Sequence, residues 1–210
     1  MPAPAPRPPE PGVPAGGGLP YDPPPMTARD PDRPYHHGDL EAAARKAALA
    51  LVEAEGGIAL SMRKVAAAAG VAHRALYNHF DGREGLLDAV AIDGYDALAG
   101  SVADAATREE FIAAYLRFGL ARPHLYALMM SRPHATMPAK PPLQAAVHRV
   151  IARAFAFFAD PDAPSAANRR RVMRVYVLLH GALSLRQAGI LDVPDDAAFI
   201  ADMQAMAEGL

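Results

Sequence analysis

The side chains best suited to chemistry in this sequence are four polar residues that recur at helical spacing within residues 61–80. They are His73, Arg74, Tyr77 and Asn78. These types match the contacts that proteins make with DNA, since Arg pairs with guanine, Asn pairs with adenine, and Tyr and His reach phosphates. We expect them to form a DNA-reading surface. The alternative is a solvated helix face that has no ligand.

Two short helices are expected to position these side chains. The first spans residues 62–69 with Ser61 as its N-cap, and the second spans residues 73–80. Gly70 between them can adopt a positive φ, which lets the two helices of a helix-turn-helix cross steeply. The residues expected to pack between the helices are Val65, Ala66, Ala69, Val71, Leu76 and Phe80.

Helical signals continue through the rest of the sequence, because alanine is abundant and strand patterns are nearly absent. Asp39, Asp81 and Thr107 are expected N-caps, and the last two begin capping-box spacings that end at Glu84 and Glu110. The sequence therefore predicts an all-α fold of about nine helices. The further helices are expected over residues 39–55, 83–103, 108–121, 123–130, 142–158, 165–189 and 195–208, with a proline-rich loop over 131–142. The helix over 165–189 is apolar on nearly all sides after its first third, which predicts burial on all sides.

Three segments together resemble the amino-terminal domain of TetR-family transcriptional regulators. They are Tyr35-His-His-Gly-Asp-Leu40, Ser61-Met-Arg-Lys-Val-Ala-Ala-Ala-Ala-Gly-Val71 and Ala75-Leu-Tyr-Asn-His-Phe80. The similarity extends to about residue 92. Farther on, Tyr176-Val-Leu-Leu-His180-Gly181 resembles the Trp-x-x-x-His-Gly signature of a C-terminal domain found in one branch of the family, with Tyr in place of Trp.

The resemblance implies a helix-turn-helix domain over residues 35–82 and a helical effector-binding and dimerisation domain over 83–210. It further implies a homodimer formed through residues 165–210 that binds a palindrome in double-stranded DNA. Such a protein would be a repressor released by a small, largely apolar effector. The positions expected at DNA are Ser61, Lys64, Ala72, His73, Arg74, Tyr77, Asn78, His79 and Arg83. Family members usually carry Ser or Thr where this chain has Ala72, so the helix cap and phosphate contact of that hydroxyl are missing.

Aromatic and methionine side chains in the second half of the sequence are candidates to line the effector pocket. They are Tyr115, Phe118, Met129, Met130, Phe155 and Tyr176. The alternative for each is ordinary core packing. His180 is expected to satisfy a buried hydrogen bond instead of contacting the effector.

The composition and the missing motifs argue against several other functions, among them metal binding and catalysis. The net charge of −2 argues against general coating of polyanions, and the absence of cysteine excludes disulfides and thiolate chemistry. His36 and His37 are adjacent and lack further ligands nearby, so neither a metal nor another cofactor is expected. No phosphate-binding loop or nucleophile elbow supports the rival hypothesis of an enzyme.

The sequence also indicates where the protein is located in the cell and which segment is disordered. No apolar run reaches the roughly 18 residues that a membrane helix needs, and we expect a cytoplasmic protein. Residues 1–34 contain 13 Pro and 4 Gly, which predicts a disordered tail. A second rival function is a helical ligand-binding module whose DNA binding is weakened or lost, and it rests on Ala72.

Overall fold

The structure is a computed structural model that describes residues 37–209, with side chains described over 39–133 and 136–209. The predictions about residues 1–34, Tyr35 and His36 therefore lie outside the described residues. The described part contains nine α-helices, two short 3-10 helices and no strand. The predicted all-α fold and number of helices are confirmed.

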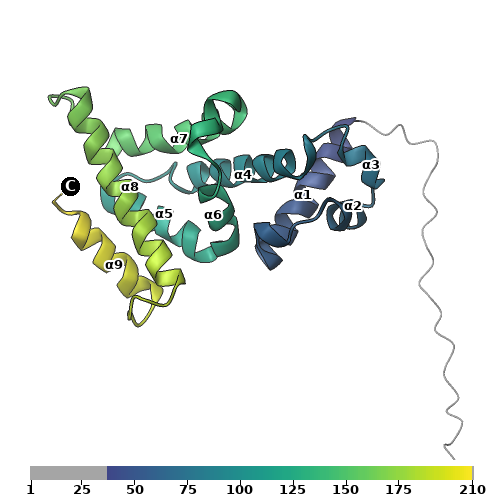
Figure 1. Cartoon of the computed structure of the whole chain (residues 1–210). Coiled ribbons are helices and arrows are strands. Elements are labelled where there is room, and N and C mark those ends of the chain that lie inside the picture. The colour runs from purple at the N-terminus through teal and green to yellow at the C-terminus, as the bar shows by residue number, and fades with distance from the viewer. Residues whose placement is uncertain (1–36, 210) are drawn as a thin grey trace, which may run out of the picture. The chain divides into compact units, whose positions relative to one another are not determined.

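Most helices begin and end close to the residues that the sequence predicted (Figure 1). The α-helices are α1 (His37–Glu55), α2 (Met62–Ala69), α3 (His73–Leu76), α4 (Gly82–Ser101), α5 (Arg108–Ala121), α6 (Pro123–Met130), α7 (Pro141–Phe158), α8 (Ser165–Gln187) and α9 (Asp196–Ala207). The 3-10 helices are η1 (Gly57–Ala59) and η2 (His134–Ala139). The prediction of a loop over 131–142 is wrong in two places, because η2 and the first residues of α7 lie within it. Proline's fixed φ is compatible with a helical first turn, so a proline-rich segment need not be irregular.

The turn between α2 and α3 has the predicted local structure. Ser61 caps α2, because its Oγ accepts a hydrogen bond from the backbone N–H of Lys64 over 3.1 Å. Gly70 ends α2 with a φ of 66°, a conformation that glycine adopts without a steric cost. Val65 and Leu76 are fully buried where the two helices meet. These contacts confirm the predicted helix-turn-helix.

A stripe of mostly small side chains lets α1 pack closely on α2 and α4. Its members are Leu40, Ala44, Ala48 and Val52, which are buried and four residues apart. Helix α1 begins at residue 37, so Asp39 lies inside its first turn. The predicted N-cap at Asp39 is therefore wrong.

The second helix of the helix-turn-helix is shorter than predicted. α3 ends at Leu76, and the backbone N–H groups of Asn78 and His79 then donate to the carbonyls of Ala75 and Leu76 over 3.2 and 3.1 Å. Hydrogen bonds from residue i+3 to residue i tighten the chain into a turn. Asn78 and His79 therefore lie on a turn that continues from α3.

The two predicted capping boxes have different outcomes. Thr107 accepts a hydrogen bond at Oγ1 from the backbone N–H of Glu110 over 3.2 Å, which confirms the box at the start of α5. Asp81 makes no such bond at the start of α4. The carboxylate of Glu84 binds Arg132 instead, at 2.9 Å, so a contact from a distant segment replaces the local one.

α8 is buried along one side only. It packs on α5, α7 and α9, and α5 approaches so closely that a Cβ on Gly119 would lie 2.5 Å from Cδ1 of Leu183. On the other side, Val177 is 59% exposed and Leu185 41%. The prediction of burial on all sides is wrong for a single chain, because no described helix covers that side.

α4 connects the helix-turn-helix to the remaining helices (Figure 1). It contacts α1 and also α5, α6 and α7. Among the described residues, no helix combines the length and the apolar character needed to cross a membrane.

Replacing Gly70 by Ala should lower the free energy of unfolding by about 1 kcal/mol, because an L side chain at this left-handed φ is strained. Urea denaturation followed by circular dichroism measures the change. Gly100→Ala is the matched control, since a Cβ on Gly100 in α4 would meet no atom within 4 Å. That variant should be neutral or slightly more stable. Equal destabilisation of both variants would contradict the role given to Gly70.

Candidate nucleic-acid interface and ligand cavity

The four predicted DNA-reading side chains share one exposed surface on α3 and the turn after it. His73, Arg74, Tyr77 and Asn78 are all exposed, and Tyr77 keeps 53% of its surface. The rings of His73 and Tyr77 contact edge-to-face with centroids 5.3 Å apart. Arg74 makes no hydrogen bond or ion pair with the other described residues. Its guanidinium is therefore available to a ligand outside the chain.

Other predicted DNA contacts carry intramolecular partners. Lys64 Nζ forms an exposed ion pair with Glu55, and exposed pairs of this kind contribute little free energy. Exchange of that partner for a phosphate would therefore cost little. His79 is half-buried beside the surface. Ala72 occupies the N-cap position of α3. Its methyl group cannot accept a hydrogen bond, so α3 has no side-chain cap.

Arg83 has a structural task within the chain. Its Nε donates to the carbonyl of Leu60 over 2.9 Å, and its Nη2 donates to the carbonyls of Gly57 and Ile58 over 2.7 and 3.1 Å. These bonds fix the segment between α1 and α2 against the start of α4. Sequence reasoning missed this role, because the carbonyls lie more than twenty residues away. The predicted phosphate contact of Arg83 stays a prediction.

A second candidate site is a cavity of about 370 Å³ enclosed by α4, α5, α6, α7 and α8. Four of the six predicted pocket residues line it: Tyr115, Met130, Phe155 and Tyr176. Its size lies within the range of about 300–1,000 Å³ typical of small-molecule sites. The lining is overwhelmingly apolar, so the cavity suits a ligand with an apolar body.

The other two predicted pocket residues lie outside the lining. Phe118 is buried, with the guanidinium of Arg122 5.7 Å from its ring centre. Met129 is fully buried and fills the space above Gly94 of α4. Both are therefore core residues in this structure, and neither lines this cavity. Periodicity alone does not separate a core position from a cavity wall.

Sequence reasoning also missed two lining residues with polar groups, Tyr95 and Arg169. Tyr95 could have been found, because it is the one aromatic residue between 83 and 103. Arg169 stands in a run of three arginines. Only its helical spacing to Val172, Met173 and Tyr176 distinguishes it from its neighbours.

Tyrosine hydroxyls on the cavity side are tied to polar partners. The hydroxyls of Tyr115 and Tyr126 are 3.1 Å apart, and the hydroxyl of Tyr126 lies 3.1 Å from Nδ1 of His180. Tyr95 donates to the carbonyl of Met129 over 3.0 Å. Burial raises the pKa of Tyr95, Tyr115 and Tyr126, so these phenols stay neutral. The predicted hydrogen bond of His180 is confirmed.

Two protein-family models match the chain. The model described as bacterial regulatory proteins, tetR family, matches residues 44–90, and the one described as tetracyclin repressor-like, C-terminal domain, matches residues 109–207. The chain belongs to the TetR family of transcription regulators. The first match includes the helix-turn-helix, and the second includes most of the residues that line the cavity.

Solved structures share this TetR fold. A protein of unknown function from Rhodococcus sp. RHA1 is 28% identical with a TM-score of 0.67, and the alignment covers 85% of this chain and 99% of that one. A TetR transcriptional regulator from Rhodococcus sp. RHA1 is 21% identical with a TM-score of 0.59, covering 83% and 96%. None of the curated proteins matches the chain.

Within this TetR-family chain, α6 contacts both the helix-turn-helix side and the cavity. At its start, Nδ1 of His124 lies 2.9 Å from the carbonyl oxygen of Glu53 in α1, and Leu128 packs on Gly57 of η1. At its end, Met130 lines the cavity. A displacement of α6 would therefore change its contacts with α1.

Replacing Arg83 by Ala should lower the free energy of unfolding by about 2 kcal/mol, because three backbone carbonyls would lose a charged donor. Arg83→Lys should lose most of the same stability, since an ammonium cannot span all three carbonyls. Arg74→Ala is the control and should change stability by less than about 0.5 kcal/mol. Chemical denaturation of the three variants tests this. A fully stable Arg83→Ala variant would leave only the phosphate role.

Proposed function

We propose that this TetR-family protein is a repressor that binds a palindromic operator as a homodimer and is released by a small, largely apolar ligand. The observation that carries the proposal is the exposed surface of α3, where Arg74 and Tyr77 have no task in the core. We assign DNA binding to residues 35–82 and effector binding with dimerisation to residues 83–210. The family is one of regulators, and no enzymatic activity is proposed.

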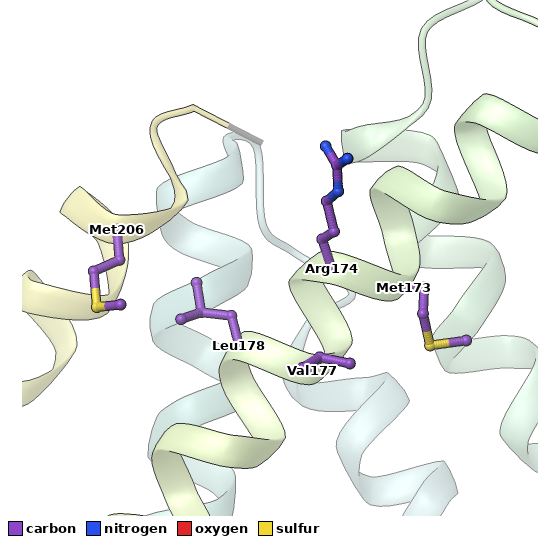
Figure 2. A pocket seen from close by; sticks show the side chains of 5 residues that line it. All are labelled: Met173, Arg174, Val177, Leu178 and Met206. Atoms are coloured by element: carbon purple, nitrogen blue, oxygen red, sulfur yellow. The ribbon is translucent and has the colours of Figure 1, made fainter.

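The dimer is proposed to form through α8 and α9. Figure 2 shows Leu178 of α8 pointing toward Met206 of α9 across a surface groove, while Arg174 extends away from it. Met206 is 62% exposed and Val177 59%. A Cβ on Gly181 would meet nothing, so a partner helix can approach closely there. Two copies of α8 and α9 would cover these side chains in a four-helix bundle.

Release of DNA requires that a ligand in the cavity favours one arrangement of the two helix-turn-helix units over another. The segment after α6 is connected to α4, which follows the helix-turn-helix directly. Arg132, which is 9% exposed, donates to Glu84 over 2.9 Å and holds the pKa of that carboxyl below its usual range. Lys140 pairs with Asp88 one turn later. Movement at Met130 can thus reach α4 as well as α1.

The rival function is a ligand-binding module without DNA binding. Its support is Ala72, which leaves α3 without a side-chain cap at a cost of about 1 kcal/mol. The intact cap at Ser61, the turn at Gly70 and the exposed Arg74 favour the operator-binding function. The test below separates the two.

Combined replacement of Arg74 and Tyr77 by Ala should weaken operator binding at least about tenfold, because a good base contact such as that expected of Arg74 contributes roughly 1–3 kcal/mol and Tyr77 is expected to add a phosphate contact. The operator is first selected from random DNA with the purified protein, and binding is then measured at two salt concentrations. Arg170→Ala, an exposed position on α8, is the matched control. Unchanged binding by the double variant, with helicity retained, would refute the interface. No selection of a palindrome by a folded dimer would favour the rival module.

Replacing Val177 by Glu should convert the dimer to a monomer, because the interface would have to bury an unpaired carboxylate. Sedimentation velocity measures the change, and circular dichroism checks that the helices remain. Ile58→Glu is the control, since Ile58 in η1 is 98% exposed and far along the chain from α8. A Val177→Glu variant that stays dimeric would place the interface elsewhere.

A further inference from the structure

We propose that the ligand of the cavity is an amphiphile with an apolar body and an anionic head, and that Arg169 binds the head. This inference rests on the proposed effector function of the cavity and specifies the chemistry of the effector. Among the sixteen described residues that line the cavity, Arg169 is the one with a charged side chain. A cation without an opposing carboxylate in the same lining selects an anion.

Arg169 stands at an edge of the cavity that solvent reaches. It is exposed, and so are Met173 and Tyr176, which follow it at helical spacing on α8. Ile151, on the facing α7, is 40% exposed. The other lining residues of α8, Val172, Val175 and Leu179, are buried. The cavity therefore opens between α7 and α8, with a cation at its rim and apolar walls inside.

The guanidinium of Arg169 has no intramolecular partner among the described residues, unlike several arginines nearby. Arg171 pairs with Asp160 over 3.5 Å, and Arg108 donates to the carbonyl of Phe157 over 2.8 Å. Arg153 donates to the carbonyls of Val102 and Ala105, which follow the end of α4. An unpaired Arg at the edge of an apolar cavity keeps its donors available to a carboxylate or similar anion.

The interior is unsuited to the charged end of such a ligand. Its phenols have bonded partners: Tyr95 donates to a backbone carbonyl, and Tyr115 is bonded to Tyr126. A carboxylate placed among these groups would lose its hydration without gaining a cation. The head must therefore stay at the rim beside Arg169, while the body enters between the helices.

The volume limits the length of the body. At about 30 Å³ for each water-sized group, a cavity of about 370 Å³ holds roughly twelve heavy atoms. Decanoate has a suitable size and carries one negative charge. Decan-1-ol has the same chain without the charge, so the two probes isolate the contribution of the head.

Isothermal titration calorimetry of the full chain with decanoate and decan-1-ol tests the inference. We expect decanoate to bind about tenfold more tightly than decan-1-ol. Arg169→Gln should weaken decanoate binding about tenfold and leave decan-1-ol binding within about twofold. Arg170→Gln is the matched control, because it removes the neighbouring charge from a residue that does not line the cavity.

Equal affinities of the two probes for the unsubstituted protein would overturn the anionic head and leave the cavity as an apolar ligand site. Equal losses for Arg169→Gln and Arg170→Gln would overturn the specific role of Arg169, since only the general positive charge of α8 would then matter. Binding of neither probe would reject both the inference and the cavity's proposed function. Circular dichroism of each variant confirms that it is folded.

Discussion

At Gly94, α4 and α6 approach so closely that a Cβ would lie 2.7 Å from Sδ of Met129. A side chain at Gly94 would therefore require Met129 and Leu125 to shift. Beside this contact, the hydroxyl of Tyr95 donates to the backbone carbonyl of Met129, and the next residue, Met130, lines the cavity. The same close approach holds the start of α6 against α1, where His124 meets Glu53. The cavity and the contact with the helix-turn-helix therefore depend on the same packing.

This packing gives a physical basis for regulation by a ligand. Protein interiors are close-packed, so a ligand that fills the cavity restricts the positions that the helices around it can take. α6 offers one connection to the helix-turn-helix through α1, and the ion pairs of Glu84 and Asp88 offer another through α4. In the proposed homodimer, a ligand that favours one position of α6 would change the position of α3 in each copy, and with it the spacing of the two recognition surfaces.

Two exposed surfaces of different chemistry are proposed to bind the two partners, DNA and a second copy of the chain. The surface of α3 is polar and contains Arg74, which suits a polyanion that brings its own phosphates. The outer side of α8 and α9 is apolar, with Val177 and Met206 exposed, which suits another copy of the same surface. The side chains named here are exposed in the single chain, so we expect their substitution to have little effect on folding.

The features that the sequence predicted correctly are those set by interactions between residues close together in the chain. The limits of α2, the cap at Ser61 and the turn at Gly70 follow from hydrogen bonds and torsion angles within about four residues, so the sequence predicted them. The same local reasoning failed at Asp81, where Glu84 binds the distant Arg132. An interaction across the fold had replaced the expected cap.

By itself the sequence determined the helices, the helix-turn-helix and the exposed side chains on α3, because periodicity and capping act within single elements. Only the tertiary structure decided which aromatic residues enclose the cavity, that Arg83 fixes the segment between α1 and α2, and that Arg169 stands at the cavity's edge. Phe118 and Tyr115 have the same helical signal, yet only Tyr115 lines the cavity. Their difference depends on how distant helices pack, which the local pattern of residues does not encode.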